Sequence, residues 1–416
     1  MVVLGIVVVL VAIFLLIKRY ETRMVLFTAG LLMATLARNP LAALNAFSKS
    51  MTIVGLIEAI CSVMGFALVM KYTECDKHLI HLVGNGLKKV RPLLIPGATL
   101  GTFAINIALP SAAGVSAAVG TIFIPILIAA GVNPATAAAA VYCGTFGSML
   151  SPGLAHNPFV AHIAGMTVMD VIKVHAKADV VAGLIGAASV TVMAYLLKEN
   201  KGYVAETAAA AGGERFKPNV LYAVIPTLPV LILLSGATGV IPLKIGVPPA
   251  MLIGVLIGLA ATRKSPTQVT KIFFEGMGSS YGSIIGIIIA AGVFVGGMEA
   301  IGLVKAFTNL LINSGPMAKL AAGFGPFVLS VVAGSGDASA LAFNQAVSPH
   351  ASQFGTSVVN MGSLATLSGA LGRTMSPVSG SAIICASIAG ISPMEVAKRN
   401  APGMIIAVIV AMFMLF

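Results

Sequence analysis

The sequence predicts an all-α polytopic membrane protein made of two inverted repeats, and its composition, its hydropathy and an internal match each support this fold class. Of the 416 residues, 58% are hydrophobic and only 9% are charged, about a third of the charged fraction of an ordinary soluble domain. Apolar runs of about 16 to 20 residues recur along the chain, and each could cross a hydrocarbon core of about 30 Å with its backbone hydrogen-bonded internally. The expected solvent is therefore the lipid bilayer.

The net charge of +12 indicates membrane topology and not nucleic-acid binding, because the basic residues lie in short loops beside the apolar runs. The four cysteines are scattered and show neither metal-ligand nor redox spacing, so we expect buried, inert thiols. The first apolar run ends at Lys18 and Arg19 without a small-residue cleavage site and is predicted to be a true span, not a signal peptide.

The elements of the first half are predicted in a fixed order. Spans are expected at 2–17, 24–36 and 52–70, a re-entrant hairpin at about 93–131, an interrupted helix at about 134–168 and a last span at 178–197. The polar residues 198–219 form the predicted cytoplasmic linker. The same order then returns at 221–237, 247–262, 279–298, 316–349, 356–392 and 401–416. The predicted repeats are therefore residues 1–197 and 220–416.

The two halves also match residue by residue. Gly144, Gly147, Ser151, Pro152, Ala164, Gly165, Met169, Asp170, Val171 and Lys173 recur about 225 positions later as Gly369, Gly372, Ser376, Pro377, Ala389, Gly390, Met394, Glu395, Val396 and Lys398. Five crossings per half would turn the second copy upside down. With both termini outside, the basic residues within 18–23, 71–91, 198–217, 263–271 and 398–399 become cytoplasmic, as the positive-inside rule requires.

Four clusters of small residues and proline interrupt the apolar segments. They lie at 108–114, 147–153, 334–339 and 372–380. Unpaired backbone groups are costly in hydrocarbon unless protein, water or ligand satisfies them. Small-residue packing faces or proline kinks would explain a single cluster, but four clusters in repeat-related pairs favour a binding site. Helix N-termini at such breaks suit a carboxylate, and free carbonyls suit a cation.

Four polar residues at these breaks are candidate binding residues. Arg373 could bind a substrate carboxylate through its planar fork or pair with an acidic residue such as Asp337. Asp337 could ligate sodium, carry a proton or neutralise Arg373. His156 and Asn157 could line the cavity or serve only in packing. Outside the breaks, Asp170 with Lys173 and Glu395 with Lys398 have the i, i+3 spacing of surface ion pairs, and we predict no transport role for them.

Three motifs resemble the DcuC-type anaerobic C4-dicarboxylate carriers of the ion transporter superfamily. They are Gly372-Arg-Thr-Met-Ser-Pro-Val-Ser-Gly380, Ile391-Ser-Pro-Met-Glu-Val-Ala-Lys-Arg399 and the tip Ala333-Gly-Ser-Gly-Asp337, within a resemblance covering about residues 24–410. The resemblance implies a homodimer in which a mobile domain of hairpins and broken helices slides against a scaffold like an elevator. The chain departs from the family pattern at Asp337, where Asn is common, and at Ala155-His-Asn157.

The resemblance also implies two sets of site residues. With Arg373, Asp337, His156 and Asn157, the substrate-binding set comprises Ser111, Ala112, Thr145, Ser148, Ser151, Ser335, Gly336, Ser339, Thr374, Ser376 and Ser379. The ion-binding set comprises Asn106, Ala113, Gly144, Gly147, Asp337, Thr366 and Gly369. A negative charge at Asp337 would repel a dianion unless it is protonated, ion-bound or paired with Arg373.

The sequence therefore predicts a secondary transporter of C4-dicarboxylates such as succinate, fumarate and malate in the bacterial inner membrane. Transport would be by exchange or by coupling to sodium or protons, with Na⁺ as the candidate coupling ion. We expect no other cofactor and no nucleic-acid partner. Another small organic anion, an amino acid or Na⁺/H⁺ exchange are alternative cargoes on the same fold. An ion channel would require a continuous polar pore, and an intramembrane enzyme would require motifs that the sequence lacks.

Overall fold

The computed structural model describes residues 1–18, 20–52, 54–87, 93–203, 216–237, 245–306, 309 and 317–416, and all regular structure within these ranges is helical. Most of the predicted linker and several of the loop lysines and arginines lie outside the described residues. Within these ranges, four helical segments are long and apolar enough to cross a bilayer: Ala112–Ala129, Val168–Leu196, Pro266–Ala300 and Pro393–Leu415. Further apolar helices are shorter. All four cysteines are buried and free.

The first half contains eleven of the helical elements used below. They are α1 (Val2–Ile17), α2 (Thr22–Leu36), α3 (Pro40–Ser50), α4 (Val54–Tyr72), α5 (Cys75–Leu87), α6 (Leu94–Ala108), α7 (Ala112–Ala129), α8 (Pro134–Cys143), the 3-10 helix η2 (Gly144–Leu150), α9 (His156–Ala164) and α10 (Val168–Leu196). The second half contains α11 (Val220–Val224), η4 (Ile225–Thr227), α12 (Leu228–Ala237), α13 (Val247–Thr262), α14 (Pro266–Ser280), the π-helical η5 (Tyr281–Ile285), α15 (Gly286–Ala300), α17 (Met317–Ala333), α18 (Gly336–Ala346), η6 (Ser348–Phe354), α19 (Val358–Thr374), α20 (Gly380–Ala389) and α21 (Pro393–Leu415).

Three of these helices lie outside the predicted spans. Helices α3, α5 and most of α14 carry charged residues such as Lys49, Asp76 and Lys271, which lower their hydropathy below that of a spanning segment. Their polar and apolar residues are segregated on opposite faces, as is usual for helices at a surface. A search for long apolar runs therefore misses them.

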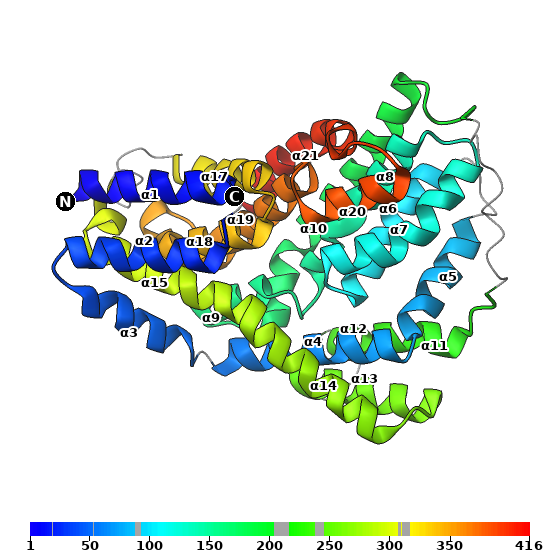
Figure 1. The fold of residues 1–416 in the computed structure, drawn as a ribbon, viewed down its shortest axis with the longest axis horizontal. Helices are drawn as coiled ribbons and strands as arrows, with labels where there is room; N and C mark the ends of the chain where they lie inside the picture. The colour runs from blue at the N-terminus through cyan, green and yellow to red at the C-terminus, as the bar shows by residue number, and fades with distance from the viewer. Residues whose placement is uncertain are drawn as a thin grey trace.

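The helices form groups with separate hydrophobic cores, and each group mixes the two halves of the chain. The largest core joins α6, α7, α8, η2 and α10 to α17, α19, α20 and α21, through buried residues such as Phe123, Phe146 and Leu364. A second core joins α4 to α12, α13 and α14, and a third joins α1 and α2 to α15. Figure 1 shows α14 and α15 as one long helix that runs beside α4 and α2.

The two helical hairpins open toward opposite ends of the bundle. At the open end of the α6–α7 hairpin, the Asn133 amide donates to the Glu199 carbonyl just after α10. At the open end of the α17–α18 hairpin, Gly323 packs on Met412 near the end of α21. Since α21 begins beside Glu199, it runs from one open end to the other.

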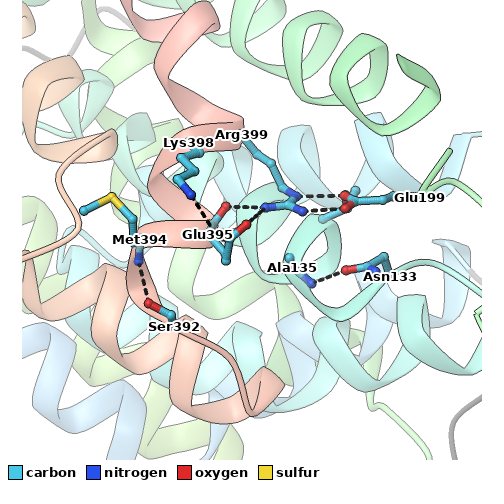
Figure 2. Close-up of polar contacts among 9 residues, drawn as sticks. Asn133, Ala135, Glu199, Ser392, Met394, Glu395, Lys398 and Arg399 are labelled. Atoms are coloured by element: carbon cyan, nitrogen blue, oxygen red, sulfur yellow. Dashed lines mark hydrogen bonds and ion pairs between the residues drawn. The ribbon is translucent and has the colours of Figure 1, made fainter. Parts of the chain in front are cut away.

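An ion-pair network centred on the nearly buried Arg399 fixes the first turns of α21 to the segment that follows α10 (Figure 2). The Arg399 guanidinium, with a side chain only 9% exposed, bonds both oxygens of Glu199 and also Glu395, the latter at 2.9 Å. The Thr136 hydroxyl donates to Glu199 at 2.5 Å. Both predicted surface ion pairs are present, Glu395–Lys398 at 2.9 Å and Asp170–Lys173 at 3.3 Å. Arg399 therefore adds a tertiary link that the i, i+3 spacing alone does not predict.

We expect Glu199→Gln to destabilise the protein by about 2 kcal/mol at neutral pH, because it leaves Arg399 with a weaker partner. Burial alone would raise the pKa of Glu199, but hydrogen bonds from Arg399 and Thr136 outweigh burial and hold this pKa below 4.5. The carboxylate thus stabilises the fold above about pH 4.5, and this contribution is lost as the pH falls through its lower folded-state pKa. Thermal unfolding in detergent between about pH 3 and pH 7 would measure both effects.

Glu275→Gln is the matched control, since that carboxylate is 58% exposed and lies 3.9 Å from Lys271. We expect it to change the unfolding temperature very little. An unfolding temperature of Glu199→Gln equal to that of the wild type across the pH range would show that the network contributes no stability.

Candidate functional site

A cavity of about 340 Å³ lies where the two hairpin tips meet the two helix breaks. From the first half it is lined by Pro110, Ser111, Ala112, Ala113, Ser148, Met149, Leu154 and His156. From the second half it is lined by Gly334, Ser335, Gly336, Asp337, Ala370, Arg373, Ser379, Gly380 and Ser381. Met64 of α4 and Ile284 of η5 close one side. Its size is at the lower end of the range of about 300–1,000 Å³ that is usual for small-molecule sites.

The first hairpin tip is made by residues 109–111, between α6 and α7. Pro110 has no amide hydrogen to continue the helix. The Asn106 side chain donates to the Leu109 carbonyl at 3.0 Å, and the Ser111 hydroxyl caps α7 by accepting from the Gly114 amide at 3.1 Å. Backbone groups freed by the break are thus satisfied locally, and the N-terminus of α7 opens onto the cavity.

The second tip has the same construction at residues 334–335. Gly334 ends α17 with a φ of 74°, a left-handed conformation that favours glycine. A side chain here would also collide with the Val378 carbonyl, 2.9 Å from a Cβ atom. The Ser335 hydroxyl caps α18 by accepting from the Ala338 amide at 3.3 Å. The N-terminus of α18 therefore also opens onto the cavity.

Two asparagine side chains hold the break between η2 and α9. The Asn157 amide group donates to the carbonyls of Met149 and Ser151, both at 2.8 Å. The Asn106 carbonyl oxygen accepts from the Ser148 amide, also at 2.8 Å. These bonds fix the segment that presents Ser148 and Met149 to the cavity.

The break between α19 and α20 is held by Tyr142 of α8. Its hydroxyl lies 2.7 Å from the Ser379 hydroxyl and 3.0 Å from the Ser376 carbonyl, and it also contacts the Arg373 carbonyl. Ser379 caps α20 by accepting from the Ala382 amide at 3.1 Å. A residue of the first half thus positions the third helix N-terminus that faces the cavity.

Arg373 supplies a fixed positive charge in the cavity wall. It donates to the carbonyl of Thr145 at 2.9 Å and to the Thr145 hydroxyl at 3.3 Å. In the described chain these bonds use two of the five N–H groups of a guanidinium. The others are available to a ligand carboxylate, whose oxygens match the fork.

Asp337 pairs with His156 and not with Arg373 in the described part of the chain. An Asp337 carboxylate oxygen lies 2.9 Å from His156 Nε2, so the predicted pairing with Arg373 is not seen, while roles in sodium or proton binding remain predictions. The Asp337 side chain is 64% exposed and lines the cavity, whereas His156 is 3% exposed. A ligand would therefore meet one carboxylate as well as one guanidinium.

The structure brings ten of the predicted site residues to the cavity wall. They are Ser111, Ala112, Ala113, Ser148, His156, Ser335, Gly336, Asp337, Arg373 and Ser379. The other eleven are not among the lining residues: Asn106, Gly144, Thr145, Gly147, Ser151, Asn157, Ser339, Thr366, Gly369, Thr374 and Ser376. Several of these support the wall; Ser339, for instance, donates to the Ser335 carbonyl at 2.9 Å. Binding roles for all of them remain predictions.

Sequence reasoning missed Tyr142, His175 and Asp179. His175 Nδ1 lies 2.5 Å from Asp179, and its Nε2 lies 3.1 Å from the Asn157 side-chain oxygen. Histidine and aspartate four residues apart in an apolar helix could have been recognised, because ionisable side chains at membrane depth are expensive. Tyr142 has no such signal in the sequence.

Apolar helices of bilayer length around a small cavity that contains Arg373 and Asp337 are the features expected of an integral membrane transporter. The family model described as "C4-dicarboxylate anaerobic carrier", DcuC, matches residues 2–416, so the chain belongs to the DcuC family. The resemblance seen in the break motifs is thereby confirmed. Proteins of this family are transporters of C4-dicarboxylates and not enzymes.

Three relatives illustrate the similarity. The chain is 43% identical over 279 residues to an uncharacterised transporter of Haemophilus influenzae. The aligned region covers 64% of this chain and all of the relative. A second uncharacterised transporter of that organism is 59% identical over 129 residues, 31% of this chain and 89% of the relative. The anaerobic C4-dicarboxylate transporter DcuC of Escherichia coli K12 is 23% identical over 359 residues, 83% of this chain and 77% of the relative.

Proposed function

We propose that this chain is a secondary active transporter that moves C4-dicarboxylates, such as succinate, fumarate and malate, across the bacterial inner membrane. The observation that carries the proposal is the convergence of three helix N-termini and Arg373 on one cavity. The first residues of α7, α18 and α20 all line it. Each N-terminus offers free amides and a partial positive charge of about half a unit.

This arrangement suits two carboxylates held a few ångströms apart. The Arg373 fork would bind one carboxylate bidentately, while the amides and capping serines of the helix N-termini would bind the other. The aliphatic centre of the substrate would lie against Met149 and Leu154, which also line the cavity. The Asp337 carboxylate is compatible with a dianion in the cavity because it is hydrogen-bonded to His156, 2.9 Å away.

We further propose alternating access by an elevator movement in a homodimer with inverted repeats. Most lining residues of the cavity in the described chain come from the group of helices around the largest core, whereas Met64, Ile284 and His156 come from helices outside that core. Sliding that group against the others would carry the whole site across the membrane. The opposite orientation of the two hairpins and the 225-residue offset of their supporting glycines agree with inverted repeats.

The transport is proposed to run as exchange or to be coupled to a sodium or proton gradient, with both termini outside the cytoplasm. The predicted sodium ligands around Asn106, Thr366 and Asp337 remain candidates for the coupling-ion site. Carbonyls freed at the helix breaks are the chemistry that would bind sodium there.

A second candidate cargo is an amino acid. The observation that favours it is the Asp337 side chain, which is 64% exposed on the cavity wall and could pair with an ammonium group. An amino dicarboxylate such as aspartate would then use Arg373 for one carboxylate and Asp337 for its amino group.

Counterflow in proteoliposomes tests both cargoes. Vesicles loaded with unlabelled succinate are expected to accumulate labelled fumarate, and protein-free vesicles are the control. Parallel vesicles loaded with aspartate or with lactate would identify the cargo. Comparing external sodium with external potassium would identify the coupling ion. Absence of fumarate uptake under every ion gradient would refute C4-dicarboxylate transport, and uptake of aspartate alone would favour the second cargo.

A further inference from the structure

We infer that His175 and Asp179 on α10 form a proton-binding site that controls the first helix break and thereby couples transport to protons. The inference rests on the proposed transport function. Both side chains are completely buried, one helical turn apart. Asp179 Oδ2 lies 2.5 Å from His175 Nδ1, and His175 Nε2 lies 3.1 Å from Asn157 Oδ1.

The hydrogen bonds fix how many protons this pair holds. The Asn157 nitrogen donates to the carbonyls of Met149 and Ser151, so its side-chain oxygen must face His175. An amide oxygen only accepts, and His175 Nε2 therefore carries a hydrogen. The second bond needs one more proton, on either His175 Nδ1 or Asp179 Oδ2. In both arrangements the pair is neutral overall and holds one exchangeable proton.

Loss of that proton would disrupt the site. The remaining imidazole hydrogen would be drawn to the Asp179 carboxylate, which leaves the Nε2 lone pair against the oxygen of Asn157. In the described chain Asp179 Oδ1 has no hydrogen-bond partner, so an ionised carboxylate would keep one oxygen unsatisfied in a buried, apolar environment. The bond between His175 and Asn157 is therefore a feature of the protonated pair.

The elements packed against α10 contribute other titratable groups. Helices α6 and α12 and the 3-10 helix η2 carry none, whereas the remaining neighbours and α10 itself supply Tyr142, Cys143, His156, His162, Arg373, Glu395, Lys398, Arg399, Asp170, Lys173, Lys177 and Tyr195. Five of these, at the breaks and in the ion-pair network, bond elsewhere: Tyr142 to Ser379, His156 to Asp337, Arg373 to Thr145, Arg399 to Glu199 and Glu395 to Arg399.

Asn157 connects this proton to the substrate cavity. It holds the carbonyls of Met149 and Ser151, and Met149 lines the cavity beside Ser148. Its neighbour His156 lines the cavity as well and bonds Asp337. Proton binding at the pair thus stabilises the substrate-binding shape of the break, and by thermodynamic linkage substrate binding strengthens proton binding equally.

Asp179→Asn tests the inference because the new amide can donate to His175 Nδ1 and so imitate the protonated pair. For the wild type we expect an inward acid gradient to drive net succinate uptake, and the Kd for succinate to be about tenfold weaker once the pair has lost its proton. For Asp179→Asn we expect exchange of succinate to persist, while the gradient drives no net uptake and the Kd becomes independent of pH.

His175→Gln provides a second test, since glutamine can still donate to Asn157 but cannot hold the proton. Asp170→Asn removes an exposed carboxylate from the same helix and should leave the gradient response unchanged. A full gradient response in both Asp179→Asn and His175→Gln would overturn the inference. If the wild type exchanges no dicarboxylate, the proposed function fails, and thermal unfolding decides about the proton site. The unfolding temperatures of the wild type and of Asp179→Asn should then change differently with pH, whereas equal pH dependence would refute the proton site.

Discussion

Replacing Arg373 by alanine is expected to weaken succinate binding about a hundredfold, equivalent to about 3 kcal/mol, and to reduce transport to background. The substitution removes a positive charge from the cavity wall together with the N–H donors of the guanidinium. In the described chain this guanidinium bonds Thr145 and not a carboxylate. Arg373→Lys keeps the charge but not the bidentate geometry, so an intermediate loss of about tenfold is expected. Isothermal titration in detergent and counterflow in vesicles measure these effects.

Two controls separate binding from folding. Lys271→Ala removes an exposed cation, 67% accessible, from α14 and should leave both measurements unchanged. The unfolding temperature of Arg373→Ala shows whether losing its bonds to Thr145 disturbs the fold. If the well-folded variant binds succinate within about threefold of the wild type, Arg373 does not bind substrate.

Gly147→Ala is expected to destabilise the protein by about 3 kcal/mol or more and to abolish transport. A Cβ atom at this position would lie 2.0 Å from the Phe103 carbonyl oxygen, so α6 would have to move away from η2. Gly372, 225 residues later, is in the same situation, with a Cβ atom 2.2 Å from the Phe327 carbonyl oxygen of α17. Both substitutions separate a hairpin arm from the broken helix beside it.

Gly278→Ala is the matched control because its Cβ atom would have no neighbour within 4 Å. On the exposed surface of α14, alanine should stabilise the helix by up to about 1 kcal/mol. Thermal unfolding and size-exclusion profiles in detergent compare the three variants. Equal unfolding temperatures for Gly147→Ala and Gly278→Ala would contradict the close approach of η2 and α6.

The positions of the helix breaks could be read from the sequence because their causes are local. Pro110 lacks an amide hydrogen, Gly334 adopts a left-handed conformation, and Ser111, Ser335 and Ser379 cap the helices that follow. Each of these effects acts within a few residues along the chain. Apolar runs likewise located the long helices, whereas the charged helices α3, α5 and α14 were missed.

The partners of the polar groups could not be read in this way, because they lie far apart in the sequence. Tyr142 reaches Ser379 across 237 positions, and Arg399 reaches Glu199 across 200. The His156 partner of Asp337 lies 181 positions away, and none of the three roles considered from the sequence included it. Hydropathy describes how deeply a residue lies in the bilayer but not which residue faces it.

Recognition through the backbone has a consequence for how such carriers can diverge. Amide groups at the starts of α7, α18 and α20 belong to the main chain, so most substitutions there leave the hydrogen-bond donors in place as long as the breaks persist. Mutational drift can therefore reshape the walls of the cavity, and with them the preference among acids of different length or substitution, while the capacity to hold a carboxylate is inherited with the fold.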